Sequence, residues 1–101
     1  MGKSVRTPAV EDLCDAILSL QTRDECYRFF EDVCTVNELM SLSQRFAVAK
    51  MLTEKKTYLE IAQETGASTA TISRVNRALI YGSDGYAMVL ERLNSGKNTE
   101  N

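Results

Sequence analysis

The sequence predicts an all-α protein of about six helices, folded as a single domain over residues 1–101. Proline and glycine are scarce, with 1 and 5 residues respectively, which disfavours a loop-rich or all-β protein. Apolar residues recur at helical spacing in successive segments, most of them preceded by helix-starting residues. The contents of 44% apolar and 26% charged residues are those of a folded domain. A domain this small buries only about two-thirds of its unfolded surface, so a partner subunit would add stability.

Four helix starts can be recognised from capping residues. Thr7 places a hydroxyl before Pro8, and proline is well suited to the first helical position. Three capping boxes of the S/T-x-x-E type follow, each ahead of an apolar periodic segment. These boxes are Thr22 with Glu25, Thr35 with Glu38, and Thr57 with Glu60.

The apolar pattern assigns the N-terminal helices to a core at about residues 8–53. The first two predicted helices each carry one apolar stripe. The third, from Val36 to about Leu52, is apolar on more than one face, so it is either a central helix or one shared between two subunits. We expect this region to be the dimerisation core. After a break at residues 82–85, a last amphipathic helix is expected to end near Gly96, followed by a frayed tail.

Residues 57–80 have the spacing of a helix-turn-helix. A small residue, Ala62, is followed four positions later by Gly66 and six positions after that by Ile72. Glycine readily adopts the positive φ that a tight corner requires, and a small residue lets the second helix cross closely. The inward-facing positions are Ile61, Ala62, Ile72 and Val75. In this motif the second helix enters the major groove of DNA.

The outward face of the second helix has the composition of a DNA-reading surface. Short hydroxyl and methyl side chains allow close approach to base edges, and arginines reach phosphate or guanine. The predicted DNA contacts are Lys56, Tyr58, Ser68, Thr69, Ala70, Thr71, Ser73, Arg74 and Arg77. The formal charge of −2 opposes DNA binding, but most acidic residues lie elsewhere in the chain. We therefore expect modest affinity with a marked salt dependence.

Several other functions are disfavoured. The chain has no histidine, and its 3 cysteines, at positions 14, 26 and 34, lack paired spacing. We therefore expect no enzymatic activity, no metal site and no cofactor, and we interpret the cysteines as reduced, small apolar residues. No apolar run approaches the roughly 20 residues of a membrane span, and the N-terminus lacks the apolar segment of a signal peptide. A cytoplasmic location without membrane contact is expected.

The GASTATISR run at residues 66–74 resembles the tryptophan repressor superfamily, which carries a GA-x-x-ATI-[ST]-R run at the same place. More specifically, the chain resembles the TrpR-like YerC/YecD family of small bacterial proteins over about residues 37–93, and we expect the resemblance to extend over the whole chain. The resemblance implies six helices and an intertwined homodimer in which the N-terminal helices of both subunits share a core. It also implies a DNA-docking mode like that of the repressor, in which the second helix of the motif enters the major groove.

The same resemblance implies a possible effector pocket formed by Gln44, Arg45, Arg74 and Val75. In the repressor, two arginines hold the tryptophan corepressor. Arg74 matches one of them, whereas the other falls on Gln44, with Arg45 adjacent. Val75 replaces a glycine and would crowd a ligand. Tryptophan is therefore not expected as a corepressor, while another small effector remains open.

The sequence leaves two functions open. The first is a homodimeric, sequence-specific transcriptional regulator, most simply a repressor, that binds double-stranded DNA. The second is a helical protein-interaction module that keeps the fold without specific DNA binding, since fold alone does not fix function. The acidic pI of about 5.1 favours the second, and the outward face of residues 69–77 favours the first.

Overall fold

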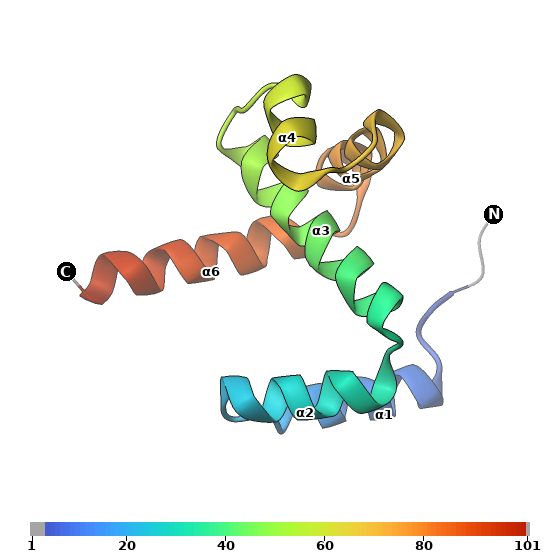
Figure 1. Ribbon diagram of the computed structural model, residues 1–101. Helices are drawn as coiled ribbons and strands as arrows, with labels where there is room; N and C mark the ends of the chain where they lie inside the picture. Colours follow the sequence, from blue (N-terminus) through green and yellow to red (C-terminus); the bar gives the residue numbers. More distant parts are fainter. Residues whose placement is uncertain (1–3, 101) are drawn as a thin grey trace. The chain divides into compact units, whose positions relative to one another are not determined.

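The computed structural model describes the backbone of residues 4–100 and the side chains of residues 4–96. Apart from residues 4–7 and the turns between helices, this part of the chain is helical, as the sequence predicts (Figure 1). The helices are α1 (Pro8–Leu18), α2 (Arg23–Val33), α3 (Val36–Thr53), α4 (Tyr58–Thr65), α5 (Thr69–Tyr81) and α6 (Gly85–Glu100).

The four predicted N-caps start the first four helices. Thr7 accepts a hydrogen bond from the Val10 N–H, and a full capping box forms at α3. There the Thr35 hydroxyl accepts from the Glu38 N–H at 3.1 Å, while Glu38 Oε1 accepts from the Thr35 N–H at 2.8 Å. The other two boxes are only half formed, because their glutamates bind elsewhere.

At α2, Glu25 Oε1 accepts from the Gln21 N–H at 2.9 Å, one residue before the N-cap. At α4, Glu60 Oε1 accepts from the Thr57 hydroxyl at 3.1 Å. The threonines still cap both helices through their side-chain oxygens. The capping box predicts that the glutamate also accepts from the N–H of the N-cap threonine. This prediction is wrong at α2 and at α4.

The prediction that the last helix ends near Gly96 is wrong, because α6 continues to Glu100. A glycine inside a helix weakens it by about 1 kcal/mol but does not by itself end it. Among the glycines within residues 4–100, only Gly66 has a positive φ. The tail predicted to be frayed is residues 97–101. The side chains of residues 97–100 and the whole of Asn101 lie outside the described residues.

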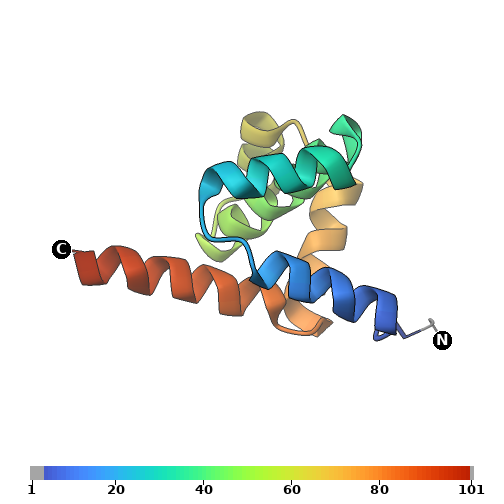
Figure 2. The ribbon, with the colours of Figure 1, turned by 90° about the horizontal axis from the view of Figure 1, so that it is seen from below.

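The chain divides into two compact units, residues 1–39 and residues 40–101. In the first unit, α1 and α2 run in opposite directions (Figure 2), and Phe29 and Phe30 meet edge to face with ring centroids 5.4 Å apart. No residue of α1 or α2 is buried. These two helices therefore expose the apolar stripes that the sequence assigns to a core, and Leu18 is 81% exposed.

The second unit contains a compact core. The buried residues are Val48, Ala49, Ile61, Ala67, Ile72, Val75 and Leu90. They come from α3, α4, the turn after α4, α5 and α6, so this core holds the α4–α5 pair against the C-terminal half of α3.

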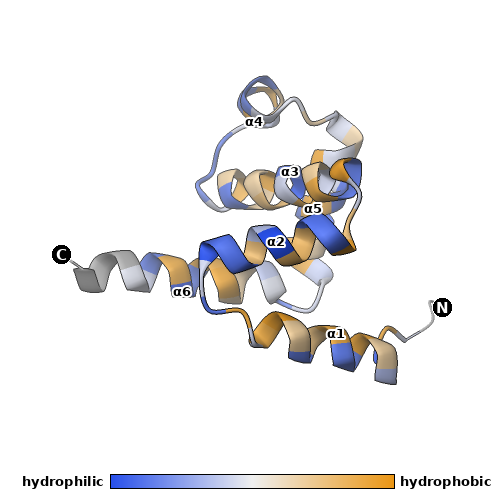
Figure 3. Ribbon diagram, turned by 60° about the horizontal axis from the view of Figure 1, so that its bottom comes forward, coloured by the Kyte–Doolittle hydropathy of each residue, from blue (hydrophilic) through white to orange (hydrophobic). Residues whose placement is uncertain are grey.

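The third helix is buried only in part. Val48 and Ala49 are fully buried, whereas Val36, Met40 and Leu42, nearer its N-terminus, remain exposed. The sequence predicts that α3 is buried on several sides. Within the single chain, only the C-terminal half of α3 is buried in this way. Figure 3 shows hydrophobic residues on α1 and α6 as well. Leu13 of α1 and Met88 of α6 are among the exposed large apolar side chains.

Candidate nucleic-acid interface

A glycine corner joins α4 to α5. Gly66 has φ +73° and ψ 6°, the left-handed conformation that ends helices, and its N–H donates to the Ala62 carbonyl at 2.9 Å. Two residues later, the Ser68 hydroxyl oxygen accepts from the Thr71 N–H at 3.1 Å and caps α5. The helices and the corner therefore lie where the sequence predicts the two parts of a helix-turn-helix.

Apolar packing fixes the inner side of this motif. Ile61 and Ile72 are fully buried, and Val75 is 2% exposed. The small Ala62 is half-buried and packs against the same core. Because these side chains face inward, the opposite side of α5 is presented to solvent.

The exposed side of α5 carries most of the residues predicted to read DNA. Thr69, Ala70, Ser73, Arg74 and Arg77 are all exposed. The helix contains no acidic residue, so its two arginines are not neutralised along its own length. This face combines small side chains with positive charge, which suits close approach to a polyanion.

Thr71 differs from the other predicted contacts. Its side chain is half-buried, and its hydroxyl oxygen lies 3.1 Å from the Ser68 hydroxyl oxygen, with which it forms a hydrogen bond. Its N–H also donates to Ser68. Ser68 and Thr71 therefore form the cap of α5, and their polar groups are already engaged within the protein.

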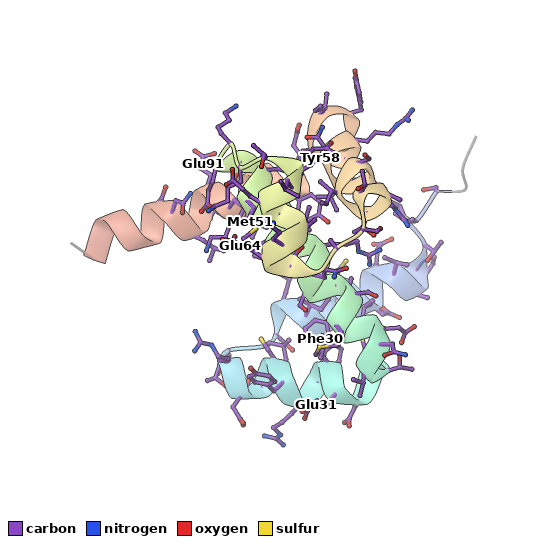
Figure 4. The ribbon with its side chains drawn as sticks, turned by 45° about the horizontal axis from the view of Figure 1, so that its top comes forward. Phe30, Glu31, Met51, Tyr58, Glu64 and Glu91 are labelled. Carbon is purple, nitrogen blue, oxygen red and sulfur yellow. The ribbon has the colours of Figure 1, made fainter. Side chains whose placement is uncertain are left out.

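Tyr58 lies at the start of α4, beside α5 (Figure 4). It lines a shallow hollow of about 600 Å³ together with Ser73 and Arg77. Asn76, Ile80 and Tyr81 complete the lining, and none of these three was predicted from the sequence to contact DNA. Their positions three and four residues from Ser73 and Arg77 on one side of α5 are the signal that could have indicated them.

Lys56 is engaged in an ion pair. Its Nζ lies 3.9 Å from Glu64 Oε2, and both side chains are partly exposed. Lys56 was predicted from the sequence as a phosphate contact, without Glu64 as its partner. At this distance and exposure the pair is weak, so the lysine remains free to exchange its partner.

The proposed effector pocket is only partly assembled. Arg45, Arg74 and Val75 line a hollow of about 450 Å³. Its remaining lining residues are Leu42, Phe46, Ala78 and Tyr86. Gln44 is not among them, because its side-chain amide donates instead to the Thr65 carbonyl at 3.1 Å. The two aromatic residues were not predicted from the sequence; their ring centroids lie 6.5 Å apart, and they come from α3 and α6.

The requirements of a metal site, a membrane-spanning helix and a cysteine site can also be compared with the described part of the chain. Within it there is no group of three or more histidine, cysteine, aspartate or glutamate residues that could hold a metal ion. None of the described helices is long and apolar enough to cross a membrane. The cysteines are free thiols, with Cys14 exposed and Cys26 and Cys34 half-buried, so none is a buried core residue in the single chain.

The six helices, with α4 and α5 forming a glycine-cornered pair against α3, define a helix-turn-helix protein of the Trp repressor type. The chain belongs to the Trp repressor protein family, whose model matches residues 9–94. This confirms the resemblance noted from residues 66–74.

Three relatives place the chain more narrowly. It is 55% identical over 96 residues to the uncharacterized protein YerC of Bacillus subtilis (strain 168), covering 95% of this chain and 89% of the relative. A TrpR-like protein from Eubacterium eligens ATCC 27750 is 69% identical, with a TM-score of 0.87, and the match covers 89% of this chain and 93% of that protein. A proposed Trp repressor from Staphylococcus aureus is 59% identical, with a TM-score of 0.86, covering 89% and 90%.

Proposed function

We propose that this protein is a sequence-specific DNA-binding transcriptional regulator, acting as a repressor, whose reading element is α5. The observation that carries the proposal is the outward face of α5, which carries small side chains together with Arg74 and Arg77 and no acidic residue. The major groove is about 12 Å wide and accepts one helix, provided that its side chains are short or reach outward. Membership of the Trp repressor family supports the same function.

The active form is a homodimer in this proposal. α1 and α2 bury no residue within one chain, although both are amphipathic. Burying one large apolar side chain is worth about 1.5–3 kcal/mol, so stripes of this kind favour association. The exposed large apolar residues of α1 and the N-terminal half of α3 are Val10, Leu13, Ile17, Leu18, Val36, Met40 and Leu42. A two-fold dimer would present two α5 helices to half-sites about one helical turn apart.

Tryptophan is not the effector in this proposal. Gln44 is hydrogen-bonded to the Thr65 carbonyl, and Val75 is almost fully buried beside the hollow that Arg45 and Arg74 line. A different small effector would need to be amphipathic and anionic, because the hollow combines two guanidinium groups with apolar walls.

A protein-binding role is the second candidate, and one observation favours it. Large apolar side chains are exposed on the reading unit itself, including Leu59, Ile80 and Tyr81, the last at 80% exposure. Exposed apolar groups on a small domain are typical of protein contacts. A helix-turn-helix fold can serve this purpose without reading DNA.

Selection of bound duplexes from a random DNA pool tests the proposal. Arg74→Ala and Arg77→Ala are run beside the parent protein, and Arg28→Ala, on α2, is the matched control. We expect a palindromic enriched site that either α5 variant weakens about ten- to a hundredfold, since a good base contact is worth about 1–3 kcal/mol.

Loss of enrichment in Arg28→Ala as well would argue against α5 as the reader. No enrichment by the folded parent dimer, with or without added tryptophan and a mixture of metabolites, would favour the protein-binding role. Enrichment that needs an added metabolite would identify an effector and leave α5 as the reader.

A further inference from the structure

Gln44 links two helices that are distant in the sequence. Its Nε2 donates to the Thr65 carbonyl at 3.1 Å, across 21 positions, and the bond is partly buried. Most of the other side-chain hydrogen bonds described in the chain join residues within four positions of each other, as caps and turns do. The Gln44 bond is therefore a tertiary contact between α3 and the C-terminal end of α4.

The acceptor belongs to the corner of the helix-turn-helix. The last carbonyls of a helix have no intrahelical donor, and the Thr65 carbonyl is one of these at the end of α4. The Thr65 hydroxyl donates to the Ile61 carbonyl at 2.7 Å and accepts from the Ala67 N–H at 3.1 Å. With the Gly66 N–H donating to Ala62, the corner is a connected set of hydrogen bonds, and Gln44 attaches this set to α3.

The bond supplies a constraint that apolar packing does not. Gln44 lies one helical turn before Val48, so both are on the side of α3 that meets the core. Hydrophobic contacts are non-directional, and a core built from them tolerates small rotations of one helix against another. A hydrogen bond has a narrow range of distance and angle, so it fixes the corner at one rotation and depth.

We propose that Gln44 is a positioning residue for the DNA-reading helix. By holding the Thr65 carbonyl, it fixes the corner shortly before the Ser68 cap, and so sets the direction in which α5 leaves the corner. The corner that precedes the reading helix is then held by a side chain of the protein itself. The expected effect of Gln44 on DNA binding rests on the proposed function. Its expected effect on the corner between α4 and α5 does not.

The test replaces Gln44 with methionine, which has nearly the same length, no added charge and no donor. Gln63→Met is the matched control, because Gln63 is an exposed glutamine on α4. Amide hydrogen exchange is followed at Gly66 and Ala67, whose N–H groups are bonded within the corner, and at Leu90 in α6. We expect Gln44→Met to accelerate exchange at the corner roughly three- to tenfold, as loss of one net hydrogen bond implies, with Leu90 unchanged.

The DNA arm uses a duplex selected by the parent protein and omits every small molecule. We expect Gln44→Met to raise the Kd roughly three- to tenfold and Gln63→Met to leave it unchanged. Equal exchange rates in the two variants, or equal acceleration at the corner and at Leu90, would overturn the positioning role. So would an unchanged Kd for Gln44→Met on a duplex that the parent binds. If the parent selects no DNA, the proposed function fails, and the exchange arm still decides whether Gln44 holds the corner.

Discussion

Gly66→Ala tests the corner with the smallest possible change. Gly66 has φ +73°, and a Cβ added to it would meet nothing within 4 Å. The cost is therefore purely local: an L-residue in the left-handed region loses about 1–2 kcal/mol. Reduced entropy of the unfolded chain returns about 0.4–1 kcal/mol of this. We expect a net loss of about 1 kcal/mol in the free energy of unfolding.

The assay is equilibrium unfolding in urea followed by helical circular dichroism, at one fixed chain concentration because stability of a dimer depends on it. With an m-value of about 2 kcal/mol/M, the midpoint should fall by about 0.5 M. Gly96→Ala is the control, since Gly96 lies within α6, a Cβ added to it would also meet nothing within 4 Å, and its φ is not positive. The same substitution should raise stability there by up to about 1 kcal/mol.

Opposite signs for these two substitutions are the essential result. If Gly66→Ala is as stable as the parent protein, the corner does not hold the left-handed conformation in solution. If it loses more than about 3 kcal/mol, a steric clash must exist that the structure does not contain, and the reasoning from local conformation is refuted.

Three further predictions concern the core, the charges and the subunit contact. Ile72→Ala empties a fully buried site and should lower the free energy of unfolding by about 2–5 kcal/mol in the same urea assay; a loss below about 1 kcal/mol would contradict its burial. Glu64→Gln releases Lys56 and should tighten DNA binding about two- to fivefold while steepening the salt dependence by about one phosphate contact, measured by titration at several salt concentrations. Leu18→Asp should weaken dimerisation about ten- to a hundredfold in sedimentation, whereas Leu59→Asp, on α4, should leave the dimer intact.

The features that could be predicted from the sequence depend on neighbours along the chain. Helix starts at Thr7 and Ser68 depend on hydroxyls within three residues of the N–H groups they accept from. The corner depends on Gly66, whose conformation is encoded by the residue itself. The buried positions Ile61 and Ile72 follow from helical periodicity. Each of these is a short-range rule of backbone or helix geometry.

The features that could not be predicted depend on tertiary structure. Gln44 was placed in an effector pocket because of its position in the family pattern, yet its amide binds the Thr65 carbonyl. The aromatic contact between Phe46 and Tyr86 joins α3 to α6, and no local pattern pairs them. Lys56 and Glu64 lie eight residues apart on either side of a helix start, outside the spacing of regular helical pairs. Side-chain partners of this kind are settled only when helices have packed.

Charge segregation between the two units resolves the apparent conflict between an acidic chain and DNA binding. Residues 1–39 carry 8 aspartates and glutamates against 4 lysines and arginines, whereas residues 40–101 carry 6 against 8. The N-terminal unit is thus formally −4 and the unit that holds α5 is +2, which together give the net −2 of the whole chain. At physiological salt, charges act over about 8 Å, so a phosphate beside α5 interacts mainly with the charges around that helix. The pI of the whole chain is then a poor guide to the proposed DNA binding, because it averages two units of opposite formal charge.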